Sequence, residues 1–206
     1  MKNKTLALTF DDGPSKDVMP RILELLDRYQ ANATFFIWGE KITAEMEPLL
    51  HQAAQMGNEL ANHSMHHLHM STLGVEEIRA EVEAVQVKLE AITGNAPVLF
   101  RPPYLDVSAL MRQVIPLPLI GGSDSRDWTP QTSTEERIRL VQEAAADGAI
   151  ILMHCFEGNT ATVNALEVLL PWFVQEGFRV TTVRELFAEK GVFPIAGQLY
   201  NAVPIC

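Results

Sequence analysis

Residues 5–14 read TLALTFDDGP, and this stretch carries the signals that decide the fold class. The run 5–10 is short and mostly apolar, as in a buried β-strand, and Gly13-Pro14 marks the turn that ends it. Between them stand Asp11 and Asp12, whose charges repel unless a cation or a proton intervenes. Neighbouring side chains leave an extended segment in opposite directions, so one carboxylate can ligate a metal while the other faces elsewhere. An ordinary acidic turn has the same composition, and the motif alone leaves both interpretations open.

Short apolar runs alternate with longer amphipathic segments along the rest of the chain. Helix signals lie between the runs: Pro20 suits the first turn of a helix through Tyr29, and Ser133 with Glu136 has capping-box spacing. This pattern indicates βα units around a parallel sheet that either closes into a barrel or stays open and doubly wound. We expect one α/β domain over residues 1–206, with strands at 5–10, 33–38, 58–62, 98–101, 116–122, 149–153 and 178–183.

Nearly all the unusual polar residues follow directly on predicted strands. In a β/α barrel the carboxyl ends of the strands share one face, where side chains from distant segments meet. This placement favours the barrel over the open sheet. It also predicts a single site, built from Asp11, Asp12, His63, Arg101, Asp124, Asp127 and His154.

Four histidines fall within the segment ELANHSMHHLHM. Spacings of three and four residues allow several pairs of these histidines to share a helical face. Spacing alone therefore does not identify which histidines are the metal ligands. Two imidazoles and one carboxylate suit Zn²⁺ and leave a position open to water. Asp12, His63 and His67 fit that set best, and we expect His66 and His69 on the surface or behind the ligands. The alternative is a solvated histidine-rich loop.

The segment RPPY (101–104) is a second candidate motif. Arg101 beside a carboxylate would hold that acid ionised and oriented. The prolines stiffen the turn, so that a backbone N–H such as that of Tyr104 can point toward an anionic oxygen. A rigid strand exit with a solvent-exposed charge is the alternative interpretation.

The segments DSRDW (124–128) and LMH (152–154) complete the candidate site. His154 ends a wholly apolar run, where a lone histidine is usually a core residue. Paired with Asp127 it becomes a protonatable acid, because a neighbouring negative charge favours the imidazolium. Trp128 and Leu152 would then form apolar walls around a small acyl group.

Composition excludes several classes of partner. The chain has 206 residues, is 47% hydrophobic and carries a formal net charge of −10. Nucleic acids and anionic membranes need a basic surface, so we expect neither as a partner. No run reaches the roughly 20 apolar residues of a membrane span. The sequence starts with the basic Met1–Lys4, but the apolar run behind it is too short for a signal peptide, so we predict no export signal in this chain.

The motifs TFDDGP, HSMHH, RPPY, DSRDW and LMH, in this order, resemble those of the polysaccharide deacetylase family, also called carbohydrate esterase family 4. The resemblance runs from Thr5 to about Pro204, and GGSDSRDWTPQTSTEERI, VTTVRELFAEKGV and LYNAVP look most like the bacterial acetylxylan esterase branch. It implies a distorted (β/α)7 barrel, one divalent metal ion and hydrolytic removal of acetyl groups from sugars. Carried over by position, the roles would be metal ligands for Asp12, His63 and His67, general base for Asp11, general acid for His154, and orienting or tuning partners for Arg101 and Asp127.

The resemblance therefore implies a metal-dependent acetylxylan esterase that takes part in xylan degradation. The alternative is an N-deacetylase of chitooligosaccharides or peptidoglycan N-acetylglucosamine. A carbohydrate- or metal-binding module that has lost catalysis is a further alternative. Such a module would not need Asp11 and His154 beside the metal ligands, so the presence of both favours an enzyme. We expect Zn²⁺, with Co²⁺ or Ni²⁺ as alternatives, an acetylated carbohydrate as the partner, and a monomer. By resemblance the enzyme is secreted; an enzyme that acts on imported oligosaccharides in the cytoplasm is the alternative.

Overall fold

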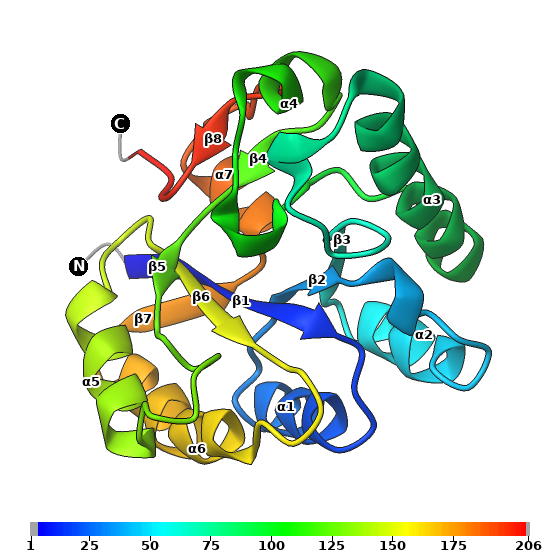
Figure 1. The fold of residues 1–206 in the computed structure, drawn as a ribbon. Coiled ribbons are helices and arrows are strands. Elements are labelled where there is room, and N and C mark those ends of the chain that lie inside the picture. The colour runs from blue at the N-terminus through cyan, green and yellow to red at the C-terminus, as the bar shows by residue number, and fades with distance from the viewer. Residues whose placement is uncertain (1–3, 205–206) are drawn as a thin grey trace.

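The computed structural model describes residues 4–204; the basic start of the chain at residues 1–3 lies outside them. Its strands are parallel, and helices surround them (Figure 1). The strands are β1 Lys4–Gly13, β2 Thr34–Ile37, β3 Glu59–Asn62, β4 Leu119–Ile120, β5 Ser123–Asp124, β6 Ile150–His154, β7 Phe178–Thr181 and β8 Leu199–Tyr200. The α-helices are α1 Val18–Arg28, α2 Glu47–Gln55, α3 Val75–Thr93, α4 Ala109–Val114, α5 Thr134–Ala144, α6 Thr160–Gln175 and α7 Val183–Glu189, and three short 3₁₀ turns lie at Gly39–Lys41, Met70–Thr72 and Pro103–Leu105.

The sheet is arranged around β1. Its order is β3–β2–β1–β6–β5, with β7 paired to the first residues of β1, and β4 pairs with β8. Single-residue bridges at Phe100 join Asn62 at the end of β3 to Leu119 of β4, from which the chain runs on into β5 beside β6. The strand neighbours thus lead back toward β1 through isolated bridges instead of continuous ladders, which is consistent with a distorted barrel.

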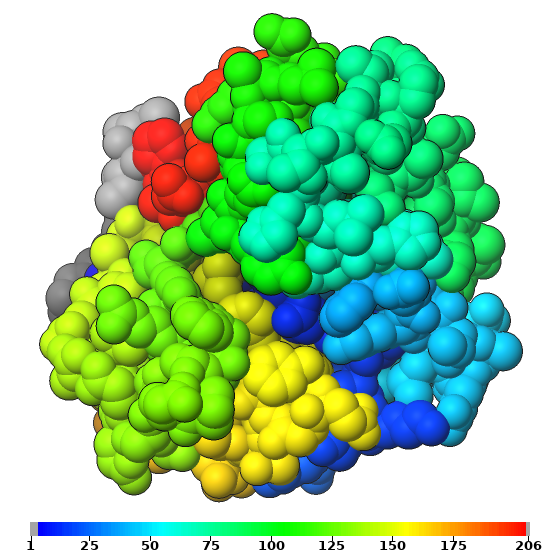
Figure 2. All heavy atoms as spheres, in the orientation of Figure 1, coloured from blue at the N-terminus to red at the C-terminus, as the bar shows by residue number. Residues whose placement is uncertain are grey.

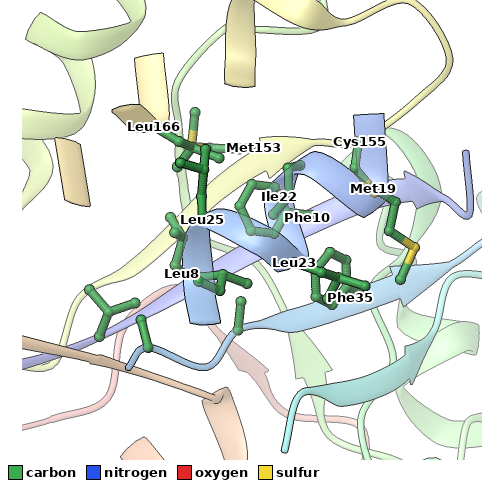
Figure 3. Packing of buried hydrophobic residues seen from close by; sticks show 14 of the residues in the cluster. Leu8, Phe10, Met19, Ile22, Leu23, Leu25, Phe35, Met153, Cys155 and Leu166 are labelled. Atoms are coloured by element: carbon green, nitrogen blue, oxygen red, sulfur yellow. The ribbon is translucent and has the colours of Figure 1, made fainter. Parts of the chain in front are cut away.

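Side chains of β1 alternate between two apolar clusters. Leu8 and Phe10 pack with Ile22 of α1 and Leu166 of α6, all fully buried (Figure 3). Ala7, which directly precedes Leu8, belongs to a second cluster on the opposite face of the sheet. Each large apolar side chain buried in this way contributes about 1.5–3 kcal/mol, so both faces of β1 fix its position.

Two predicted strands are shorter than expected. Segment 98–101 forms only the bridge at Phe100, because two prolines follow at once and end the pairing. Segment 116–122 forms only β4. Beyond it, a Cβ on Gly122 would lie 3.0 Å from the carbonyl oxygen of Ile150, so a glycine lets the chain pass this close to β6. The pairing of β8 with β4 was not predicted.

The expected helix signals are found close to their predicted places. α1 begins two residues before Pro20 and ends at Arg28. Ser133 is the N-cap of α5, and its hydroxyl accepts a hydrogen bond from the Glu136 N–H at 3.2 Å. Within residues 4–204, none of the helices has the length and apolar character needed to cross a bilayer.

Candidate active site

The polar residues at the strand ends meet in one pocket of about 370 Å³. In the space-filling view, blue atoms of the N-terminal part of the chain lie at the floor of a hollow that cyan, green and yellow segments surround (Figure 2). Five distant pieces of chain supply the lining: Asp11, Asp12, His63, His67, Tyr104, Leu105, Asp124, Trp128, Leu152 and His154.

Asp12, His63 and His67 form the one group of three or more potential ligands found among the described residues. Asp12 Oδ1 lies 3.5 Å from His63 Nε2 and 3.2 Å from His67 Nε2. His63 Nδ1 must carry its proton, since it donates to the carbonyl oxygen of Arg101 at 2.8 Å, and its Nε2 lone pair therefore faces the carboxylate. Asp12 Oδ1 is buried, and no hydrogen-bond partner for it is found among residues 4–204. Lone pairs that converge in this way fit a bound cation.

The segment that carries the histidines is a loop, so helical spacing does not explain the ligand pair. Ser64 and His67 have positive φ angles of 64° and 55°, and Asp12 has one of 63°. Non-glycine residues adopt this conformation only when their surroundings hold them there. Asn62 Oδ1 accepts from the Ser64 N–H at 2.9 Å, and Ser64 Oγ accepts from the His67 N–H at 3.1 Å. These short-range bonds turn both imidazoles toward Asp12.

His66 and His69 point away from Asp12. His66 Nδ1 lies 2.5 Å from Glu81 Oε1, and Glu81 Oε2 accepts from the N–H groups of Met65 and His66 at 3.0 and 2.8 Å. His69 stacks on the ring of Tyr104 with centroids 4.0 Å apart. Glu81 of α3 thus anchors the histidine loop, and sequence reasoning missed it because a glutamate in an amphipathic helix is expected on the surface.

Asp11 is buried beside the completely buried Arg101. Arg101 Nη1 donates to Asp11 Oδ1 at 2.6 Å and to Thr9 Oγ1 at 2.8 Å, while Nε and Nη2 donate to the carbonyl oxygens of Ile120 and Gly121. Burial lowers the pKa of Arg101, and the carboxylate of Asp11 opposes that shift. The other carboxylate oxygen of Asp11 remains on the side of the pocket, 3.8 Å from His63 Nε2.

His154 stands directly beside Asp11, because the two residues are paired in the register of β1 and β6. Its Nδ1 lies 2.7 Å from Oδ1 of the completely buried Asp127, and its main-chain N–H donates to Oδ2 of the same carboxylate at 2.8 Å. Burial acts to lower the pKa of His154, but the charge and hydrogen bond of Asp127 outweigh it and raise the pKa to about 9. The protonated form of this imidazole is therefore favoured at the pocket floor, next to Asp11.

The rim of the pocket is aromatic. Trp128 and Tyr104 are 56% and 59% exposed, while Leu152 is buried in the wall. Trp128 Nε1 donates to Asp124 Oδ2 at 3.1 Å, which fixes the indole and leaves its ring accessible. Tyr104 has a positive φ of 57° in the turn after the two prolines, so its backbone is held in a defined conformation. Each residue predicted for the site therefore lies in the pocket or touches a residue that lines it.

Three comparisons bear on the family. A polysaccharide deacetylase family model matches residues 1–116. A bifunctional xylanase/deacetylase of Pseudobutyrivibrio xylanivorans is 39% identical over 93% of this chain and 32% of its own length. A peptidoglycan-N-acetylglucosamine deacetylase of Listeria monocytogenes is 33% identical over 91% of this chain and 40% of its own length. The chain thus spans about a third to two fifths of the length of these relatives.

The chain is also similar to a solved structure over almost its whole length. The family 4 acetyl xylan esterase from Clostridium thermocellum, solved with a cobalt ion, superimposes with a TM-score of 0.94. It is 32% identical, and the match covers 98% of this chain and 100% of the other. Motifs, fold and similarity agree, and the chain belongs to the polysaccharide deacetylase family, carbohydrate esterase family 4.

Proposed function

We propose that residues 1–206 form a catalytic domain that hydrolyses O-acetyl esters on xylan or xylo-oligosaccharides. The observation that carries the hydrolytic part is the pairing of Asp11 with His154 across neighbouring strands, beside the group formed by Asp12, His63 and His67. The choice of xylan rests on the names of the xylanase/deacetylase and the acetyl xylan esterase that the chain resembles.

Asp12, His63 and His67 would hold one divalent metal ion in this proposal. Two neutral imidazoles and a carboxylate are a common ligand set for Zn²⁺, and Co²⁺ or Ni²⁺ suits the same donors. When bound, the metal would supply a positive charge that polarises the acetyl carbonyl and makes water more acidic. Oδ1 of Asp12, which is buried and for which residues 4–204 supply no hydrogen-bond partner, supports this assignment.

Asp11 and His154 would divide the proton transfers between them. Arg101 holds one oxygen of Asp11, so the other is available to take a proton from the attacking water as general base. The tetrahedral oxyanion would accept a hydrogen bond from the Tyr104 N–H. His154 would then give its proton to the departing sugar oxygen as the acyl C–O bond breaks, which leaves acetate and a free hydroxyl.

The walls of the pocket favour a neutral sugar. Trp128 offers an exposed ring face of the kind on which the apolar face of a pyranose packs, and Leu152 offers an apolar surface for the acetyl methyl group. Asp124 lines the same pocket with an exposed carboxylate. A negative charge at this point repels polymers that carry carboxylates and accepts hydrogen bonds from sugar hydroxyls.

Deacetylation of N-acetylglucosamine residues is the second candidate, because the chain also resembles a peptidoglycan deacetylase. The test is acetate release from acetylated xylan, N-acetylglucosamine oligomers and peptidoglycan, each assayed after chelation and again after addition of Zn²⁺, Co²⁺ or Ni²⁺. We expect release from acetylated xylan that stops with chelator and returns with metal. Faster release from the amide substrates would overturn the xylan assignment, and activity indifferent to chelator would overturn the metal. Since polymeric xylan lies outside cells, this proposal also places the enzyme there.

A further inference from the structure

A second buried arginine lies behind the pocket, on the far side of Asp127. Arg137 of α5 is 3% exposed, although it sits in a helix whose neighbouring arginine is on the surface. Its Nε donates to the carbonyl oxygen of Thr132 at 3.0 Å. Its Nη1 donates to Asn159 Oδ1 at 2.7 Å and to Thr162 Oγ1 at 3.0 Å. None of these partners lines the pocket, so the contacts of Arg137 are separate from those of Arg101.

The donors of Arg137 fix the direction of two further hydrogen bonds. A guanidinium can only donate, so the Thr162 oxygen accepts from it and the hydroxyl proton is left for Asp127 Oδ2, 2.6 Å away. In the same way Arg137 holds the carbonyl end of the Asn159 amide, and the NH₂ end must face the other way. That end donates to the carbonyl oxygen of His154 at 3.1 Å and lies 3.4 Å from Asp127 Oδ2.

These bonds occupy one oxygen of Asp127 and leave the other for the imidazole. Oδ2 receives Thr162, Asn159 and the His154 N–H, while Oδ1 is 2.7 Å from His154 Nδ1. A carboxylate locked in this rotation keeps the proton on Nδ1 and directs Nε2 into the pocket. Loss of the lock would let the carboxylate rotate and the imidazole turn with it.

We propose that Arg137 is a positioning residue for His154, acting through Thr162, Asn159 and Asp127. The inference rests on the proposed function, in which His154 protonates the departing sugar oxygen. Arg137 does not touch the substrate, so its contribution lies in the orientation of the imidazole. The planar guanidinium is essential, because it donates to Asn159, Thr162 and the Thr132 carbonyl at the same time. A lysine ammonium is a point charge and cannot hold these three acceptors in one plane.

The test compares two esters that differ in their need for an acid. A 4-nitrophenyl acetate leaving group departs without protonation, whereas an acetylated xylo-oligosaccharide needs His154. Arg137→Met and Thr162→Val should lower kcat on the sugar ester about tenfold or more, and kcat on the nitrophenyl ester by less than about threefold, with KM nearly unchanged. Thr162→Ser keeps the hydroxyl group and should therefore retain most of the activity on the sugar ester. Arg139→Met is the matched control, because Arg139 pairs on the surface with Glu136 and Glu143, and it should change neither rate.

A second measurement is independent of turnover. The Nδ1–H of His154 in its bond to Asp127 should give a downfield proton signal in the NMR spectrum of the wild type, and Arg137→Met and Thr162→Val should shift or broaden it. Equal losses on both esters, or an unchanged signal in both variants, would overturn the role of Arg137. Failure of the wild type to release acetate from any sugar would instead overturn the proposed function, and the NMR signal would still decide the positioning role. Should Arg137→Met fail to fold, Thr162→Val alone carries the test.

Discussion

Replacement of Asp127 by asparagine should move the basic limb of the pH–rate profile. Asp127 is completely buried, and its charge and hydrogen bond are the main reasons why the pKa of His154 lies at about 9 instead of the ordinary 6.5. An asparagine at this position would have nearly the same shape but no charge. Burial, the largest influence on His154, then outweighs the weaker attraction of Asp11 and Asp12, and the pKa falls toward 6.5 or below.

The size of the effect follows from these two values. The rise in the pKa of His154 from 6.5 to about 9 corresponds to roughly 3.4 kcal/mol between the protonated and neutral imidazole. At pH 8 an imidazole with a pKa of 9 is about 90% protonated, and one with a pKa of 6.5 is about 3% protonated, a ratio of roughly 30. At pH 6 both remain mostly protonated. The general acid is therefore lost as the pH rises, and the loss caused by Asp127→Asn should grow between pH 6 and pH 8.

The assay is kcat for acetate release from an acetylated xylo-oligosaccharide between pH 5 and pH 10, with metal held in excess. Misorientation of the imidazole adds a loss that does not depend on pH, so the diagnostic is the position of the basic limb and not the height of the profile. The nitrophenyl ester serves as the control, because its leaving group needs no proton and its profile should lack the shift. A basic limb that stays near pH 9 in the variant would refute the reasoning.

Three further substitutions test the metal ligands and the partner of Asp11. His67→Ala should abolish metal binding measured by calorimetry and metal-dependent acetate release, while His66→Ala should retain most of both; the opposite result would mean that the ligand register is displaced by one residue. Arg101→Met leaves the carboxylate of Asp11 buried without its cation, which should cost about 3–5 kcal/mol of unfolding free energy in urea denaturation. A loss below about 1 kcal/mol would show that Asp11 does not depend on this partner.

The parts of the fold that could be predicted are those with a continuous apolar run. The apolar runs of β1 and β6 are buried on both faces of the sheet, so Leu6–Leu8 with Phe10 in β1 and Ile150–Met153 in β6 give a strong sequence signal. β8 has only two residues, and its pairing with β4 depends on where the rest of the chain leads it. A pair of this length has no periodicity that a sequence pattern could reveal.

The residues of the candidate site also differ in how readily the sequence predicts them. Asp11, Asp12 and His63 could be located because each follows a strand that the apolar pattern reveals. Glu81 and Arg137 could not, because both occupy helices in which charged residues are normally exposed. Their burial follows from the contacts of α3 with the histidine loop and of α5 with α6. The residues proposed to bind the metal or the substrate, and their direct partners Arg101 and Asp127, could thus be inferred from sequence order, whereas Glu81 and Arg137, which lie further from the pocket, required the three-dimensional structure.

The alternation of β1 explains why a buried charge pair stands at the floor of the pocket. Ala7 lies in the apolar cluster on one face of the sheet, and Thr9 and Asp11 follow it on the same face at every second position. Arg101 meets both of them while its guanidinium lies 4.0 Å from the ring centroid of Phe36. An apolar pair of similar volume would be as stable or more so, because the desolvation of two charges offsets most of their attraction. Stability therefore does not account for this pair, whereas a carboxylate held in place by a guanidinium beside the pocket is what the proposed hydrolysis requires.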